Sequence, residues 1–118
     1  MNTQVVMPID LEKDIPEISE ELRNHKAGSI DDVMLALNEV TTRNIRTHNF
    51  GAVTRCFKAA ETLYNNGNAV IKNAIENSFV YSFTKLFMSF PAEKQQLIAI
   101  IPTTLYSLYR AQVCHGGC

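Results

Sequence analysis

Apolar residues recur along this chain at spacings of three and four, and strict alternation of apolar and polar positions is rare. This period is that of a helix with one buried face, so the pattern predicts helices almost throughout. The first stripe carries Pro16, which is harmless only in a first helical turn. We therefore expect a short turn at residues 9–13 and a helix from about Asp14, its N-cap, to His25. The stripe consists of Leu11, Ile15, Ile18 and Leu22.

A second helix is predicted from Ser29 to about His48, after a break at residues 26–28. Ser29 and Asp32 resemble a capping box with Asp in place of Glu, which marks a helix start. Its apolar face contains Ile30, Val33, Met34, Leu37, Val40 and Ile45.

Residues 49–90 predict two helices joined by the turn at residues 65–68. The first spans about Phe50 to Tyr64 and ends at Gly67, which we expect in the left-handed conformation that closes many helices. Asn68 is expected to cap the next helix, from about Ala69 to Met88. That helix begins amphipathic, through Val70, Ile71, Ala74 and Ile75, and then becomes apolar on nearly all sides, which predicts a buried C-terminal half. The all-round apolar residues are Phe79, Val80, Tyr81, Phe83, Leu86, Phe87 and Met88.

Ser89, Pro91 and Glu93 indicate one more helix start, and Pro102 divides the region that follows. Residues 92–101 and 103–113 could form two helices at an angle or one kinked helix, because proline disfavours helical geometry in the preceding residue. The second piece offers Leu105, Tyr106, Leu108, Tyr109 and Val113 for burial, and residues 114–118 are too short and glycine-rich to continue it.

The expected fold is therefore all-α, with residues 1–113 as a single domain of five to six helices and residues 114–118 as a tail. The helices are expected to pack as antiparallel hairpins around the buried fourth helix. A length of 118 residues and an apolar content of 46% suit one domain with one core. The longest aliphatic run, Leu97 to Ile101, is far too short to span a membrane, and the first residues lack a basic start for a leader. A cytoplasmic protein without membrane contact is expected.

Charge is segregated: residues 1–32 hold eight of the twelve acids but three of the eleven bases. An acidic first helix could pair with a basic face of the same molecule, or the separation could attract a charged partner. The densest basic group contains Arg43, Arg46, His48, Arg55 and Lys58. It could bind a phosphate or an acidic partner surface, or it could be a solvated face that complements the acidic first helix. A pI near 6.3 argues against nucleic-acid binding.

Residues with chemical potential are few. Cys114, His115 and Cys118 offer two thiols and an imidazole, but a metal site usually needs four ligands, and CxxxC is not the redox spacing CxxC. Cys56 is expected to be a small buried hydrophobe. No phosphate loop, nucleophile elbow or zinc-protease motif occurs, and no cofactor is expected. The aromatic series either fills the core or lines a ligand cavity; it comprises Phe79, Tyr81, Phe83, Phe87, Phe90, Tyr106 and Tyr109.

Three segments carry a family resemblance: Ile-Pro-Glu-Ile at residues 15–18, CFKAAETLYNNGN at 56–68, and VIKNAIENSFVY at 70–81. With the late proline before a final Leu-rich helix, they resemble a family of small all-helical bacterial proteins of unknown function, over roughly residues 10–112. The resemblance implies a helical fold and no catalytic residues.

These observations favour a non-catalytic helical domain that binds a protein of unknown identity, such as an immunity-like or adaptor protein. The alternative is a thiol- or metal-dependent activity of Cys114, His115 and Cys118.

This alternative makes a direct prediction. Purified protein should carry stoichiometric zinc or a rapidly alkylated thiol if the tail is a metal or redox site. Elemental analysis combined with thiol titration measures both, and the absence of both would remove the hypothesis. In either situation we expect the tail thiols to react before Cys56, because thiolates in apolar surroundings are disfavoured.

Overall fold

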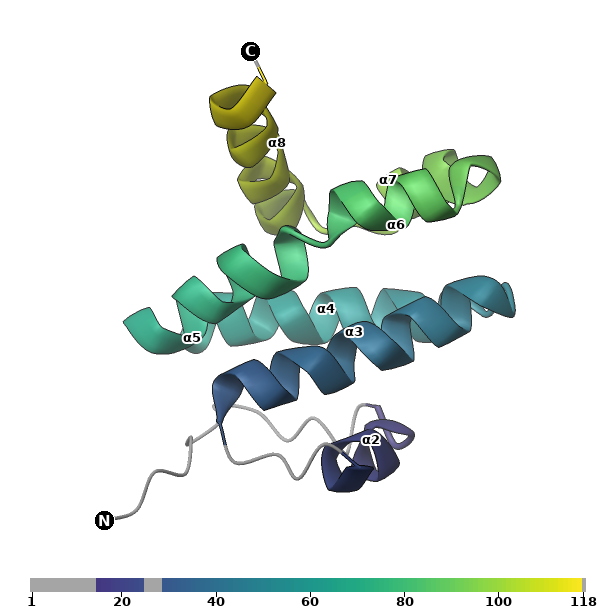
Figure 1. Cartoon of the computed structure of the whole chain (residues 1–118), viewed down its shortest axis with the longest axis vertical. Coiled ribbons are helices and arrows are strands. Elements are labelled where there is room, and N and C mark those ends of the chain that lie inside the picture. The colour runs from purple at the N-terminus through teal and green to yellow at the C-terminus, as the bar shows by residue number, and fades with distance from the viewer. Residues whose placement is uncertain (1–14, 25–28, 118) are drawn as a thin grey trace.

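Helices form almost all of the chain in the computed structural model, which describes residues 15–24 and 29–117 (Figure 1). Of residues 23, 24 and 114–117 only the backbone is described. The all-α class is confirmed, and no strand occurs among the described residues. The elements are α2 (Ile18–Asn24), α3 (Ile30–Arg46), α4 (Phe50–Asn66), α5 (Ala69–Ala74), the π-helix η1 (Ile75–Val80), α6 (Phe83–Ser89), the 3-10 helix η2 (Pro91–Glu93), α7 (Lys94–Ile100) and α8 (Thr103–Gly117).

The first described helix, α2, begins two residues after Pro16. A turn precedes it, in which the amide of Ile18 donates to the carbonyl of Ile15 at 3.0 Å. Pro16 therefore stands before the helix, where its missing amide proton costs nothing. Ile15 and Ile18 are fully buried, and α2 packs against α3. The predicted turn at 9–13, the cap at Asp14 and the helix end at His25 lie outside the described residues.

The start of α3 confirms the predicted cap at Ser29. The Ser29 hydroxyl accepts from the Asp32 amide at 3.3 Å and donates to the Asp32 carboxylate at 3.1 Å. The Asp32 backbone amide, which a helix start would otherwise leave unpaired, is thereby satisfied, and the second bond joins the two side chains. Met34, Leu37 and Val40 are fully buried along the helix.

A tight turn connects α3 to α4 and reverses the chain, so that the two helices lie antiparallel, side by side (Figure 1). His48 has a positive φ of 59°, and its amide donates to the Ile45 carbonyl at 3.0 Å. The Asn49 amide reaches the Asn44 carbonyl at 2.8 Å. This pair of bonds is the Schellman ending of a helix, with histidine in the place that glycine usually takes. The Asn49 side chain then caps α4 by accepting from the Ala52 amide at 3.3 Å.

The turn between α4 and α5 contains Gly67, and the predicted left-handed conformation is wrong. Its φ of −85° and ψ of 162° are extended backbone that any residue can adopt. Space requires the glycine instead: a Cβ would lie 2.5 Å from the Leu63 carbonyl oxygen and 2.6 Å from a methyl carbon of Ile71. Asn68 caps α5 as predicted, accepting from the Ile71 amide at 3.1 Å.

The predicted helix from Ala69 to Met88 is not continuous. It consists of α5, the π-helix η1, a turn at residues 81–82, and α6, and the chain changes direction before α6 (Figure 1). In a regular α-helix, successive side chains are offset by about 100° around the helix axis. A π-turn contains more residues than an α-turn, so it changes this offset. A face predicted with a constant helical period therefore loses its phase beyond η1.

The predicted burial of two residues in the apolar half is wrong. Tyr81 is 72% exposed and Met88 is 77% exposed, whereas Phe79, Val80 and Phe83 are fully buried, so this half of the segment meets the core on one side and solvent on the other. In the first half of the predicted helix, Val70 is also exposed, and Ile71 and Ile75 are buried as expected.

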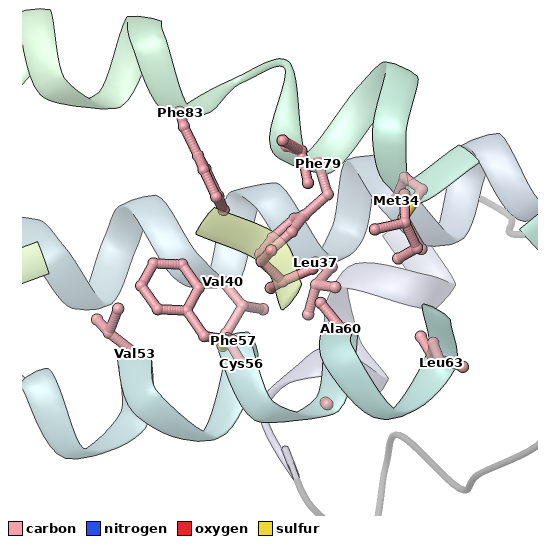
Figure 2. Close-up of a cluster of buried hydrophobic side chains, with 14 of the residues drawn as sticks. Met34, Leu37, Val40, Val53, Cys56, Phe57, Ala60, Leu63, Phe79 and Phe83 are labelled. Carbon is pink, nitrogen blue, oxygen red and sulfur yellow. The ribbon is translucent and has the colours of Figure 1, made fainter. Parts of the chain in front are cut away.

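The core is an aromatic cluster between α4, η1 and α6 (Figure 2). Phe57 of α4 meets Phe79 and Phe83 edge to face, with ring centroids 6.0 and 5.6 Å apart. Phe87 packs on Tyr109 of α8 at 5.4 Å. Contacts of this kind are favourable because the positive edge of one ring meets the negative face of the other. The core interpretation of the aromatic series is confirmed for Phe79, Phe83 and Phe87, and it is wrong for Tyr81.

The C-terminal region forms two helices at a steep angle, α7 and α8 (Figure 1). Ile101, before Pro102, has the extended ψ of 125° that proline imposes on its predecessor. Gln112 of α8 donates to the carbonyl of Glu76 in η1 at 2.6 Å. Two expectations fail here: Val113 is 43% exposed, and α8 continues to Gly117, so the backbone of the tail extends the helix.

Two glycines offer a matched test of the α4–α5 turn. Gly67→Ala should lower the free energy of unfolding by about 1–3 kcal/mol, because its methyl group collides with backbone and with Ile71. Gly51→Ala, whose Cβ would meet only Asn49 Oδ1 at 3.8 Å, should raise it by about 0.5 kcal/mol through helix propensity. Urea denaturation measures both. Equal effects of the two substitutions would contradict the steric explanation.

Candidate functional site

The predicted basic group divides among several surroundings, beginning with Arg43. Its guanidinium pairs with the carboxylate of Glu21 on α2, whose side chain is only 8% exposed. The hydrogen bond to Glu21 is the main cause that raises the pKa of Arg43. Beside this ion pair, the side-chain amide of Asn44 donates a hydrogen bond to the Glu17 carboxylate at 3.2 Å. An acid of α2 and a base of α3 thus form an ion pair within the molecule, and Arg43 stabilises the contact between these two helices.

His48 lies at the α3–α4 turn and contacts the opposite end of the chain. Its Nε2 is 3.1 Å from a carboxylate oxygen of Glu93 in η2, and its ring stacks near Phe50 with centroids 6.0 Å apart. The imidazole side chain is 64% exposed. The histidine therefore links the turn to the start of α7, in addition to closing α3 through its backbone.

Arg55 and Lys58 lie on α4 and line a shallow hollow of about 260 Å³ with Ala59 and Thr62. Arg46 lines a different hollow, described below. The five predicted basic residues therefore do not line one common site: Arg43 faces α2, His48 faces η2, and the others line two separate hollows.

The structure tests the predicted role of Cys56, and the predicted metal or redox role of the C-terminal cysteines stays a prediction. Cys56 is fully buried, and burial raises the pKa of its thiol to about 11, as expected of an inert thiol. The side chains of Cys114, His115 and Cys118 lie outside the described residues. Among the side chains that are described, no three histidine, cysteine, aspartate or glutamate residues form a group that could hold a metal ion.

The most open apolar side chains gather around α6. Tyr81 and Met88 border a hollow of about 410 Å³, together with Thr84, Lys85 and Ser89. These positions follow the helical spacing of three, four and seven, so they form one stripe on the outer side of α6. Nothing in the described part of the chain covers this stripe, since both apolar side chains remain more than 70% exposed.

A second hollow of about 430 Å³ lies between α3 and α6. Lys85 and Ser89 line both hollows, which are therefore adjacent across α6. Leu86, only 7% exposed, and the half-buried Phe90 supply apolar surface, and Leu35 on α3 is 52% exposed. The remaining lining residues are polar: Asn38, Glu39, Thr42, Arg46 and Ser82. We call the two hollows together the α6 surface.

The α6 surface is held by α3 and carries two cations. The Ser82 hydroxyl donates to the Asn38 side chain at 3.3 Å and to the Phe79 carbonyl at 2.6 Å, which fixes the turn before α6 against α3. Neither Arg46 nor Lys85 forms an ion pair with a carboxylate in the described parts of the chain. Glu39 lies one turn from Arg43 on the same helix, and its negative charge contributes to raising the pKa of Arg43. The charge of Glu39 is therefore directed partly toward Arg43.

Sequence reasoning placed Tyr81 and Met88 in the core and so missed this surface. A signal was present nevertheless. Between these two residues, on the same helical face, stand Thr84 and Lys85, and a fully buried stripe would not hold an unpaired lysine. A lysine in the middle of an apolar stripe was the indication that this face meets solvent.

Comparison with known proteins assigns the family. The sequence matches the domain of unknown function DUF7674 over residues 9–115. The chain belongs to this family, which confirms the resemblance to a helical family without an assigned activity. No curated protein and no solved structure matches the chain. In the described residues, no helix has the length and apolar content needed to cross a membrane.

The two arginines of α3 allow a test of the α2–α3 ion pair. Arg43→Met should lower the free energy of unfolding by about 1–3 kcal/mol, because it removes the guanidinium from a buried carboxylate. Arg46→Met, in the same helix and with no ion pair to lose, should change it by less than about 0.5 kcal/mol. Guanidinium chloride would screen the pair, so urea is the denaturant of choice. Similar losses in both variants would show that Arg43 has no special structural role.

Proposed function

We propose that this chain is a non-catalytic protein-interaction domain and that it binds its partner at the α6 surface. The observation that carries the proposal is the exposure of Tyr81 and Met88, at 72% and 77%, beside two adjacent hollows. Apolar side chains scattered singly over a surface are ordinary, whereas a group of them around a concavity is typical of a binding site.

The chemistry of the α6 surface supports a protein as the ligand. Tyrosine, methionine, phenylalanine and arginine are enriched at the centres of protein interfaces, and the surface holds Tyr81, Met88, Phe90 and Arg46. Its polar residues are interspersed with the apolar ones, so a partner would need both apolar and polar groups to match it. Full burial of a side chain such as Met88 contributes about 1.5–3 kcal/mol before the costs of association.

The same residues give little support for catalysis. Hydroxyl groups need a neighbouring base to act as nucleophiles. The lining of the two hollows includes serine, threonine and tyrosine, and its possible bases are Glu39 and Lys85. Among the described residues neither base is hydrogen-bonded to one of these hydroxyls, and the Ser82 hydroxyl bonds to Asn38 and to a backbone carbonyl instead. Within the class of interaction domains, we propose a cytoplasmic adaptor or an immunity-like protein, which acts by covering a surface of its partner.

The test compares two pairs of exposed apolar residues. The full chain, immobilised and exposed to lysate of its source, should retain one stoichiometric partner. The double variant Tyr81→Ser with Met88→Ser should lose that partner, with at least a tenfold weaker binding. The control Val70→Ser with Val113→Ser removes apolar side chains that are 58% and 43% exposed but lie away from the α6 surface, and it should bind as the original chain does.

Thermal unfolding of all variants checks that the fold survives. A partner that both double variants retain equally would overturn the assignment of the α6 surface. Failure of the original chain to retain any partner would count against the interaction function itself.

A further inference from the structure

We infer that the α6 surface binds an amphipathic helix of a partner protein, and that this helix presents a carboxylate to Lys85. This inference rests on the proposed function and adds the chemical class of the ligand. Shape, apolar lining and charge each contribute to it.

The shape of the second hollow suits a helix of about three turns. Its α3 wall is a single stripe that starts at Leu35, passes Asn38 and Thr42, and ends at Arg46. At 1.5 Å per residue these positions span about 16 Å along α3. The opposite wall is α6. Two helical walls with no strand edge in the described residues offer no backbone pairing to an extended peptide, and they favour recognition in the manner of a helix in a groove.

The apolar lining defines where the partner helix would bury its own side chains. Leu35, Leu86 and Phe90 give the second hollow an apolar lining, and Met88 and Tyr81 border the first. Two aliphatic side chains of the partner, three or four residues apart, would enter these adjacent hollows from one helical face. Met88 is suited to such contact because its flexible thioether adapts to the shape of the ligand.

The cations of the α6 surface determine which polar group the partner helix should carry. Lys85 lines both hollows and therefore lies where the two apolar contacts meet, and Arg46 lines the second hollow from α3. Neither has a carboxylate partner in the described chain, and Glu39 acts in part on Arg43. An acidic residue between the two aliphatic anchors would pair with Lys85 on binding, and complementary charge of this kind gives specificity and fast association.

Two other occupants fit less well. A second copy of this chain across a twofold axis would bring the same patch against itself, and because each patch holds two cations, Lys85 and Arg46, and one acid, Glu39, the contact would enclose an excess of positive charge. A bilayer surface presents no projecting side chains that could fill two hollows of about 410 and 430 Å³. Amphipathic anchors to lipid expose a projecting apolar face instead.

The test is a selection of helical peptides on the full chain. A displayed library of three- to five-turn helices with one randomised face is panned against the original chain, and the selected peptides are then measured against Met88→Ser. We expect peptides that depend on Met88 to carry aspartate or glutamate between two aliphatic residues. Lys85→Glu should weaken their binding at least tenfold, and changing the peptide acid to lysine should restore binding to Lys85→Glu. Lys72→Glu serves as the control for net charge, since Lys72 lies away from both hollows beside Tyr64.

Each outcome has a distinct meaning. Selected peptides that depend on Met88 but are neutral or basic, or that tolerate Lys85→Glu, would overturn the acidic-helix inference and leave the proposed function standing. The absence of any Met88-dependent peptide would overturn both. So would binding of the original chain, but not of Tyr81→Ser with Met88→Ser, to phosphatidylserine vesicles. A dimer in sedimentation that the same double substitution abolishes would replace the partner helix with a second copy.

Discussion

The contact of Phe79 with Phe57 and Phe83 is the interaction on which the rest of the structure depends. Phe79 belongs to the π-helix η1, and through this contact η1 lies against α4 while it also touches α3 and α8. All three rings are almost completely buried (Figure 2). Because aromatic rings bury large areas and prefer particular angles, the cluster fixes both the position and the rotation of the chain at η1.

That rotation determines which side of α6 meets solvent. The wider π-turn changes the phase of the helix, the Ser82 bonds to Asn38 and Phe79 hold the new direction, and α6 presents Tyr81, Lys85 and Met88 outward. Local departures from α-helical geometry of this kind are frequent at functional sites. Here the departure both completes the core, through Phe83 and Phe87, and creates the candidate binding surface on the opposite face of the same short helix.

The charge pattern serves the fold more than the surface. Glu21 of α2 pairs with Arg43 of α3, and Glu17, just before α2, accepts from the Asn44 side chain, so part of the charge separated along the sequence is paired within the molecule. Several cations have no ion pair among the described residues, and two of them, Lys85 and Arg46, line the α6 surface beside its apolar side chains. Their position beside exposed apolar groups makes them more informative about a ligand than a dense cluster of charges in the sequence.

The sequence by itself determined the helical class, the starts of α3 and α5, and the break at Pro102, because capping side chains and proline act on neighbouring residues. It also indicated the burial of Cys56 and of three members of the aromatic series, Phe79, Phe83 and Phe87. Tertiary structure decided what depends on contacts between distant residues. Gly67 is required by the approach of Leu63 and Ile71 and not by its own conformation. Tyr81 and Met88 are exposed because the core packs against one side of their segment, the side that carries Phe79 and Phe83. A segment that is apolar on nearly all sides does not show which side the rest of the chain will cover, because that depends on contacts with distant residues.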